Sequence, residues 1–224
     1  VVVDELHTMR GIFGTHVAHL LRRLRRLCHH YGADPTFVFC SATIGAPGRL
    51  ASDLCGLEVA EVVDDGSPRG ERLVALWNPA EVGPRAVAPS EEEGRRRSAN
   101  TEAADLTAAL VTEGRRTITF CRSRKGAELV ATMVRRRVPR HLEHTVRSYR
   151  GGYLAEERRA IEAELFDGTL RGVVATTALE LGVDIGGLDA CVLNGFPGTI
   201  ASLWRQAGRA GRSAQQSLAV LVAG

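Results

Sequence analysis

The first residues of the chain join an apolar run to two adjacent acids. Val1–Val3 read as a short buried strand, and Asp4 and Glu5 follow it directly. Open α/β sheets bind ligands at the carboxyl ends of their strands, where these carboxylates would lie. An Asp there can hold Mg²⁺, usually through water, and an adjacent Glu can accept a proton from an attacking water. The pattern suits phosphoryl transfer, although two acids after a strand can equally cap a helix.

Two small hydroxyl residues follow a second predicted strand, Thr36–Cys40. The hydroxyls of Ser41 and Thr43 could hydrogen-bond the acidic pair and sense a terminal phosphate. Because small hydroxyl residues commonly end strands, this segment carries weight only in combination with the others.

An arginine pair stands near the carboxyl end of the chain, in the segment from Gln206 to Arg212. Arg209 and Arg212 are three residues apart, so one helix face or a tight turn can direct both at one anion, and Gly208 and Gly211 permit close backbone approach. Such arginines can stabilise transition-state charge during phosphoryl transfer. The alternative is a surface loop rich in glycine and arginine.

The run from Thr176 to Gly186 collects small, hydroxyl and acidic residues at the end of another predicted strand. Backbone and hydroxyl groups of this kind contact nucleic-acid phosphates, and a carboxylate can bind a ribose hydroxyl. A helix that ends at a glycine explains the same letters equally well.

The elements that must position these residues alternate between strands and helices. Beyond the first strand, the apolar spacing predicts a helix over Gly14–Tyr31, strand Thr36–Cys40, helix Pro47–Leu54, strands Val59–Val63 and Leu73–Trp77, helix Glu102–Glu113, strand Thr117–Cys121, helix Gly126–Arg136, a region around Val146–Tyr149, helix Glu156–Phe166, strands Gly172–Thr176 and Ala190–Leu193, helix Ile200–Arg205 and strand Ser217–Val222. This rhythm is typical of α/β domains with parallel, helix-covered sheets.

Turn residues divide the chain into two predicted lobes. The densest turn chemistry lies at residues 64–70, so we expect a first lobe over residues 1–65, a linker over 66–72 and a second lobe over 73–224. The stretch Pro84–Asn100 mixes acidic and arginine runs and is expected to be a solvated loop.

Composition narrows the class of protein without naming a partner. The 29 basic and 26 acidic residues give a net charge of +3, too even a balance to diagnose a polyanion partner. The five cysteines are scattered singly, so neither a disulfide framework nor a zinc site is indicated. No apolar run approaches a membrane span, and we expect a cytoplasmic protein, nucleoid-associated if bacterial.

Taken in order, these segments resemble a known set of helicase motifs. The set comprises Asp-Glu-x-His at residues 4–7, Ser-Ala-Thr at 41–43, Phe-Cys-Arg-Ser-Arg at 120–124, the run at 176–184 and Gln-x-Gly-Arg-x-Gly-Arg at 206–212. It is similar to motifs II to VI of superfamily-two DExH helicases. The resemblance implies two RecA-like lobes, with the first lobe incomplete in this sequence.

Further segments narrow the resemblance to one family. The chain carries His-Thr-Met-Arg-Gly-Ile-Phe-Gly at 7–14, Gly-Ser-Pro-Arg-Gly at 66–70, Trp-Asn-Pro at 77–79, Tyr-Arg-Gly-Gly-Tyr at 149–153 and Gly-Phe-Pro-Gly-Thr-Ile-Ala-Ser at 195–202. They resemble the mitomycin-repair type of DExH DNA helicase, related to RecQ-four-like enzymes. That resemblance implies an ATP-dependent 3′ to 5′ DNA repair helicase with a separate zinc-binding domain.

The resemblance also assigns roles around the phosphates. It implies that Asp4 organises Mg²⁺, through water, and that Glu5 is the catalytic base. His7 would couple to Gln206 and to Ser41 and Thr43. Gln206, Arg209 and Arg212 would face the γ-phosphate of ATP, with Arg212 as the arginine finger.

The remaining roles concern the nucleotide sugar and the nucleic-acid strand. Asp184, beside Gly182, would contact the ribose or brace the cleft between the lobes. Arg122, Ser123 and Thr176 would follow the backbone of a DNA strand, either single-stranded or in a tailed duplex. Backbone tracking suits a motor because it needs no base recognition.

One departure from the family pattern limits what this chain can do. No G-x-x-x-x-G-K-[ST] loop occurs, and the only lysine, Lys125, stands in an unsuitable context. We therefore expect the 224 residues to be part of a longer active protein and to hydrolyse no ATP alone. Two alternatives stay open: a DExH RNA helicase, and a non-catalytic RecA-like scaffold that binds nucleic acid.

Overall fold

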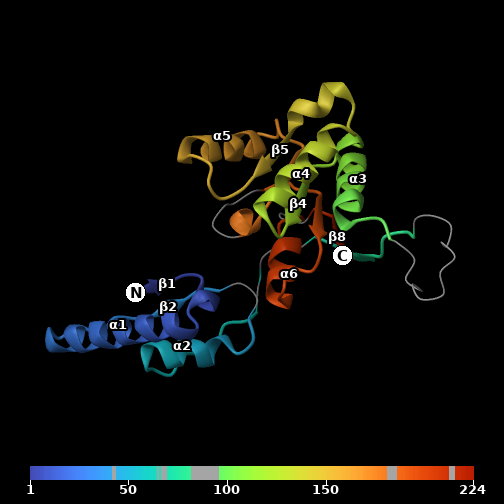
Figure 1. Cartoon of the computed structure of the whole chain (residues 1–224). Coiled ribbons are helices and arrows are strands. Elements are labelled where there is room, and N and C mark those ends of the chain that lie inside the picture. Colours follow the sequence, from blue (N-terminus) through green and yellow to red (C-terminus); the bar gives the residue numbers. More distant parts are fainter. Residues whose placement is uncertain (42–43, 65, 67–69, 82–95, 181–185, 212–214) are drawn as a thin grey trace. The chain divides into compact units, whose positions relative to one another are not determined.

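The computed structural model describes residues 1–41, 44–64, 66, 70–81, 96–180, 186–211 and 215–224. It consists of two compact units, Val1–Ser67 and Pro68–Gly224. The division falls within the linker expected at residues 66–72. Both units are drawn in Figure 1, and each is described by itself below.

The first unit is a small parallel pair of strands packed against helices. Strand β1 (Val2–Val3) pairs in parallel with β2 (Val38–Phe39), and a 3-10 turn, η1 (Leu6–Thr8), follows β1. Helices α1 (Gly11–His30) and α2 (Pro47–Cys55) complete the unit. Its buried core consists of Leu6, Leu21, Ala51 and Leu54.

Two arginines of α1 hold the end of α2. Arg25 Nη1 donates to the carbonyls of Cys55 (2.8 Å) and Gly56 (3.0 Å), and Arg22 Nη2 donates to the carbonyl of Asp53 (2.8 Å). The last carbonyls of a helix lack partners within it, so cationic donors there satisfy them and complement the helix dipole. Arg22 and Arg25 therefore hold the C-terminal end of α2 against α1.

A strand predicted at Val59–Val63 is absent from the described part of the first unit. The segment pairs with no described strand, and Val62 and Val63 are 91% and 72% exposed. Adjacent β-branched residues favour a strand only when a neighbouring strand and a buried face are present.

The second unit is an α/β domain built on a six-stranded parallel sheet with strand order β3-β8-β7-β4-β6-β5. Its strands are β3 (Arg72–Trp77), β4 (Thr117–Cys121), β5 (Val146–Tyr149), β6 (Gly172–Ala175), β7 (Ala190–Asn194) and β8 (Ser217–Val222). Its helices are α3 (Ala99–Thr112), α4 (Arg124–Arg135), α5 (Ala155–Phe166) and α6 (Ile200–Ala207), with 3-10 turns η2 (Arg140–Thr145) and η3 (Thr177–Leu179).

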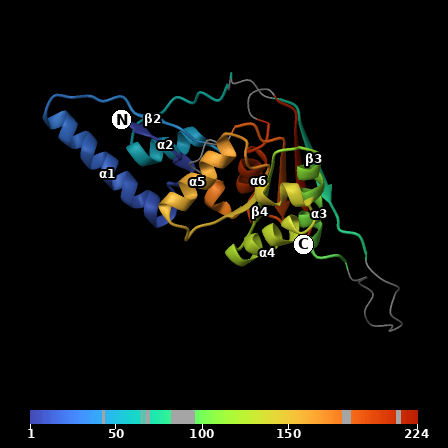
Figure 2. The same ribbon diagram turned by 90° about the horizontal axis from the view of Figure 1, so that it is seen from above.

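Helices cover both faces of this sheet, as Figures 1 and 2 show. On one face, α3 and α4 contribute buried residues such as Ala108 and Val130 to a core that includes Val174. On the other face, Leu165 of α5 and Leu203 of α6 pack with Ile118 and its neighbours. Strands buried on both faces read as runs dominated by apolar and β-branched residues, which is why β4, β6 and β7 were predictable.

Helix α3 starts earlier than its apolar pattern indicates. The sequence predicted a start at about Glu102 and a loop through Asn100, but Ser98 caps the helix by accepting from the backbone N–H of Thr101. The first turn is polar, so apolar periodicity could not find it, whereas the N-cap serine could. None of the described helices is long and apolar enough to span a membrane.

Candidate functional site

The acidic residues of the first unit lie at one edge of its strand pair. Because β1 and β2 run parallel, Asp4 and Ser41 both leave the sheet at the carboxyl ends of their strands. The N–H of Leu6 donates to the carbonyl of Cys40 over 3.0 Å and keeps the two segments together beyond the strands. Asp4 and Ser41 are both exposed, so this edge is accessible to a ligand.

His7 connects the acidic pair to the hydroxyl segment. Its Nδ1 lies 3.3 Å from Glu5 Oε2 and 3.4 Å from Ser41 Oγ, while its side chain is only 11% exposed. One ring nitrogen is therefore shared between a carboxylate and a hydroxyl from two different strand ends. The roles of Glu5, His7 and Ser41 stay predictions, as does the pairing of His7 with Gln206.

Glu5 occupies an unusual backbone conformation. Its φ of 55° and ψ of 42° place a non-glycine residue in the left-handed region, which costs on the order of 1 kcal/mol or more. Local hydrogen bonds support it: Glu5 N–H donates to Asp4 Oδ1 (2.7 Å), and the Glu5 carbonyl accepts from the N–H (2.9 Å) and the hydroxyl (2.8 Å) of Thr8. Strain retained at a carboxylate beside a strand end is typical of functional sites.

The side chains at this edge suit a magnesium ion that is bound through water better than one ligated directly by several protein side chains. No group of three or more His, Cys, Asp or Glu side chains among the described residues could hold a metal ion. Asp4 offers an exposed carboxylate, one oxygen of which accepts from Glu5 N–H. Mg²⁺ typically takes one or two carboxylates and completes its shell with water and substrate phosphates, so Asp4 is compatible with it.

In the second unit, three adjacent strands bring the predicted strand-binding residues to one edge. β6 lies between β4 and β5, with Phe120 and Tyr149 both in register with Ala175. Arg122 and Ser123 therefore leave the sheet at the same level as Thr176. Arg122 is exposed, and its guanidinium lies against Gly195, where an added Cβ would stand 3.6 Å from its Nε.

The two predicted hydroxyl contacts also begin helical turns. Ser123 Oγ accepts from the N–H of Gly126 (3.0 Å) at the start of α4, and Thr176 Oγ1 accepts from the N–H of Ala178 (3.5 Å) at the start of η3. A hydroxyl that caps a helix keeps its own hydrogen available for a phosphate oxygen. Ser123 is exposed, whereas Thr176 is 9% exposed.

Two of the three predicted phosphate-facing residues of the second unit, Gln206 and Arg209, belong to the described residues, and both are buried. Gln206 and Arg209 are 3% and 6% exposed. Gln206 Nε2 donates to Glu180 Oε2 over 2.9 Å, and Arg209 Nη2 donates to the carbonyl of Glu180. Both side chains bind the turn that follows β6, and their roles toward ATP stay predictions.

Sequence reasoning did not single out Glu180, although it organises this region. Its carboxylate also accepts from Ser202 Oγ (3.0 Å) and pairs with Arg205 Nε (3.2 Å), and Glu180 is 5% exposed. The signal in the sequence was one acid within a run of mostly small residues. The three polar residues of α6 that bind this acid can be recognised only once the fold is known. Four other predicted residues, Thr43, Gly182, Asp184 and Arg212, lie outside the described residues.

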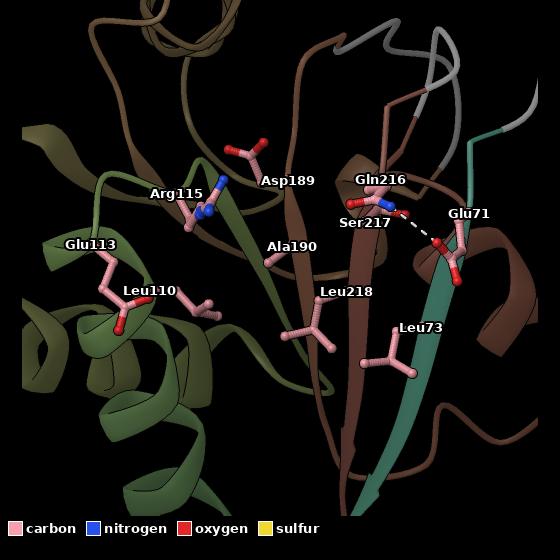
Figure 3. A pocket seen from close by; sticks show the side chains of 10 residues that line it. All are labelled: Glu71, Leu73, Leu110, Glu113, Arg115, Asp189, Ala190, Gln216, Ser217 and Leu218. Carbon is pink, nitrogen blue, oxygen red and sulfur yellow. Dashed lines mark hydrogen bonds between the residues drawn. The ribbon is translucent and has the colours of Figure 1, made fainter.

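A pocket at the opposite edge of the sheet carries no predicted residue. Figure 3 shows it between the end of α3 and the first residues of β3, β7 and β8. Two of its three acids are engaged, since Asp189 accepts from Arg116 N–H (2.8 Å) and from Gln215, and Glu71 accepts from Gln216 Nε2 (3.0 Å). Open α/β sheets bind ligands at the carboxyl ends of strands, so we place no site here.

Comparison with known proteins decides the family. The sequence matches the helicase conserved C-terminal domain over residues 101–214, about half of the chain. The chain belongs to this helicase family.

Longer helicases resemble the chain over its whole length. The uncharacterized ATP-dependent helicase YprA of Bacillus subtilis (strain 168) is 45% identical over 224 residues, which are 100% of this chain and 29% of YprA. The crystal structure of the DUF1998 helicase MrfA bound to DNA has a TM-score of 0.92 at 45% identity, covering 100% of this chain and 29% of that one. The structure of MrfA bound to DNA and AMPPNP has a TM-score of 0.89 at 44% identity, covering 100% and 30%.

These helicases confirm two predictions: the family resemblance that was inferred from the motifs, and the RecA-like α/β fold. The chain spans less than a third of the length of these relatives. The helicase domain match begins within α3 and ends beyond α6, so it contains Arg122, Ser123, Thr176, Gln206 and Arg209.

Proposed function

We propose that the protein containing this chain is an ATP-dependent DNA helicase or translocase of the DNA-repair type. The observation that carries the proposal is the grouping of Glu5, His7 and Ser41 at one strand edge, with His7 Nδ1 within 3.4 Å of both partners. ATP hydrolysis that is coupled to motion requires a catalytic base and a residue that responds to the state of that base. The binding of DNA and AMPPNP by MrfA supports the choice of DNA and of a nucleoside triphosphate.

In this proposal the first unit supplies the base and the metal contact. Glu5 accepts the proton of the attacking water, and His7 holds the Glu5 carboxylate in place. Asp4 would hold Mg²⁺ through water, and the bound ion would supply positive charge to the phosphates of ATP. The second unit supplies Arg122, Ser123 and Thr176 to the DNA backbone, and Gln206, Arg209 and Arg212 to the phosphates. Cytoplasmic, nucleoid-associated action belongs to the same proposal.

The decisive experiment replaces the base in the complete protein. Glu5→Gln keeps the size and hydrogen-bonding ability of the side chain but removes its basicity. We expect DNA-stimulated ATP hydrolysis to fall by at least about a hundredfold while nucleotide binding is retained, since general base catalysis contributes about 10²–10⁴-fold. Unchanged hydrolysis would overturn the assignment of Glu5. The 224 residues alone should show no hydrolysis, and measurable DNA-stimulated turnover would contradict that.

The same assay separates the alternatives. Stimulation by single-stranded DNA well above that by RNA supports a DNA motor, whereas the reverse order identifies an RNA helicase. A complete protein that binds nucleic acid but hydrolyses no ATP is the scaffold, and the functional proposal is then wrong.

A further inference from the structure

A carboxylate on α4 gathers donors from the segment that follows β5. Glu128 Oε2 accepts from Ser148 Oγ (2.9 Å), and Glu128 Oε1 accepts from Tyr153 OH (2.7 Å) and from Arg150 Nε (2.7 Å). Burial raises the pKa of Glu128, but the hydrogen bonds from Tyr153, Arg150 and Ser148 outweigh it and leave the pKa below its ordinary value. Glu128 therefore fixes the residues on either side of the Gly151–Gly152 turn.

Arg150 is held on two sides by this network. Its Nε is bound by Glu128, and its guanidinium carbon lies 4.6 Å from the centre of the Tyr153 ring. Stacking and hydrogen bonding together restrict a side chain that would otherwise sample many rotamers. The guanidinium is thus positioned beside the turn in advance of any ligand.

A second guanidinium reaches the same turn from the start of α4. A Cβ added to Gly151 would stand 3.6 Å from Arg124 Nη2, and one added to Gly152 would stand 3.5 Å from Arg150 Nη1 and 3.8 Å from Arg124 Nη1. Both cations therefore converge on one pair of glycines. Gly152 has a φ of +103°, a conformation that side chains rarely adopt, so the backbone there stays uncovered.

The charge of Arg124 is not compensated within the described structure. Arg124 is exposed, and no hydrogen bond or ion pair joins it to a residue in the described ranges. Glu128 offsets the charge of Arg150 alone. Two neighbouring guanidinium groups that are offset by a single carboxylate leave a net positive charge. They favour an anion with several acceptor oxygens, and the geometry of phosphate matches that of guanidinium groups well.

The position of this pair indicates which phosphate it would bind. β5 is the neighbour of β6, and β6 is the neighbour of β4, so Arg150 continues the row formed by Arg122 and Thr176 at the carboxyl ends of the strands. Neighbouring strands lie about 4.8 Å apart, so the row spans roughly 10 Å. A strand that follows Arg122 and Thr176 would reach Arg124 and Arg150 next.

We propose that Arg124 and Arg150 bind a backbone phosphate of the DNA strand above Gly151–Gly152, and that Glu128 is the positioning residue for Arg150. This inference rests on the proposed DNA motor and adds a contact to its strand-binding edge.

The first test measures the affinity of the complete protein for a fluorescent single-stranded oligothymidine at several salt concentrations. Arg124→Ala and Arg150→Ala should each weaken binding on the order of tenfold and lower the slope of log K against log salt by about 0.7, the loss of one phosphate contact. Arg136→Ala is the matched control, since Arg136 is an exposed arginine at the other end of α4. Because Arg124 lies outside the Glu128 network, its variant tests the site even if Arg150→Ala disturbs folding.

The second test uses the sign of a charge change. Glu128→Gln removes a negative charge, so simple electrostatics predicts tighter DNA binding, whereas the positioning role predicts binding several times weaker with a shallower salt slope. Glu143→Gln, an exposed acid on η2, gives the purely electrostatic effect. Tighter binding by Glu128→Gln, equal to that of the control, would overturn the positioning role.

The outcomes also separate this inference from the functional proposal. If Arg122→Ala weakens binding while Arg124→Ala and Arg150→Ala match the unmodified protein, the phosphate site is wrong and the DNA motor stands. If the complete protein binds no single-stranded DNA at all, both are wrong.

Discussion

Glu5 and Glu180 differ in how fully their carboxylates are engaged by neighbouring side chains, and that difference separates their roles. Glu180 is 5% exposed and receives Ser202, Arg205 and Gln206, so it has no free position for a substrate proton. The side chain of Glu5 is 39% exposed, and among the described residues its carboxylate forms an ion pair with His7. Accessibility with one orienting partner suits a base, whereas saturation in the interior suits a structural anchor.

Tyr149 allows a residue-scale test of how the end of β5 is held. Burial and the hydrogen bond to Glu162 raise the pKa of Tyr149 to about 12. The neutral phenol is thus favoured in the folded state, so its contribution to stability is complete below pH 10, the ordinary pKa, and is lost as the pH rises toward 12.

We expect this loss to amount to roughly 2 kcal/mol by pH 12 and to be missing in Tyr149→Phe. Urea unfolding followed by tryptophan fluorescence at pH 9 and at pH 11.5 measures it. The pKa values of Cys121 and Cys191 are also raised by burial, but both cysteines are present in the two proteins and cancel in the comparison. Equal pH dependence of the two proteins would contradict the prediction.

At the scale of elements, Arg25 links α1 to α2. The sequence around Arg25 does not indicate this role. Arg25→Ala removes both hydrogen bonds to the last carbonyls of α2 and should lower the stability of the first unit by about 1–2 kcal/mol. Thermal unfolding followed by circular dichroism measures the change. Arg23→Ala, an exposed arginine of the same helix, should stay within about 0.5 kcal/mol, and an equal loss there would contradict a specific role for Arg25.

The elements that sequence reasoning placed well are those whose signal is local. Thr117–Cys121 and Ser217–Val222 were predicted to the residue because each is a short run rich in apolar or β-branched residues with a polar residue before it. Val59–Val63 failed because the same local signal needs a partner strand, and none is described. The start of α3 was placed late because it is a polar turn fixed by Ser98.

The site divides in the same way. The order of motifs placed Arg122, Ser123 and Thr176, because strand ends can be read from the chain and parallel strands bring them to one edge. The contacts that hold the site could not be read, since Glu180 and Arg209 are 29 residues apart, and Glu128 and Arg150 are 22 residues apart. Such pairs are set by packing between elements, which a single sequence does not reveal.

At the scale of the whole molecule, the two units differ in how much core they possess. The first unit buries a cluster of four residues around two-residue strands, and Val2 on β1 is 71% exposed. The second unit encloses a six-stranded sheet between helices on both faces. Because stability rises with the fraction of surface buried, the first unit should unfold at lower urea concentration than the second.

The positions of the tryptophans make this difference measurable in the intact chain. Trp77 and Trp204 are the only two tryptophans, and both lie in the second unit, whereas circular dichroism also reports α1 and α2 of the first. We expect a circular dichroism transition that begins at lower urea than the fluorescence transition, since the probes coincide only in two-state unfolding.

Leu54→Ala, which removes a core side chain that is 3% exposed, should move only the early phase, at a cost of about 2–5 kcal/mol. Leu165→Ala, the matched change in the second unit at 1% exposure, should move the fluorescence transition. Coincident curves that respond equally to both substitutions would show that the units unfold as one.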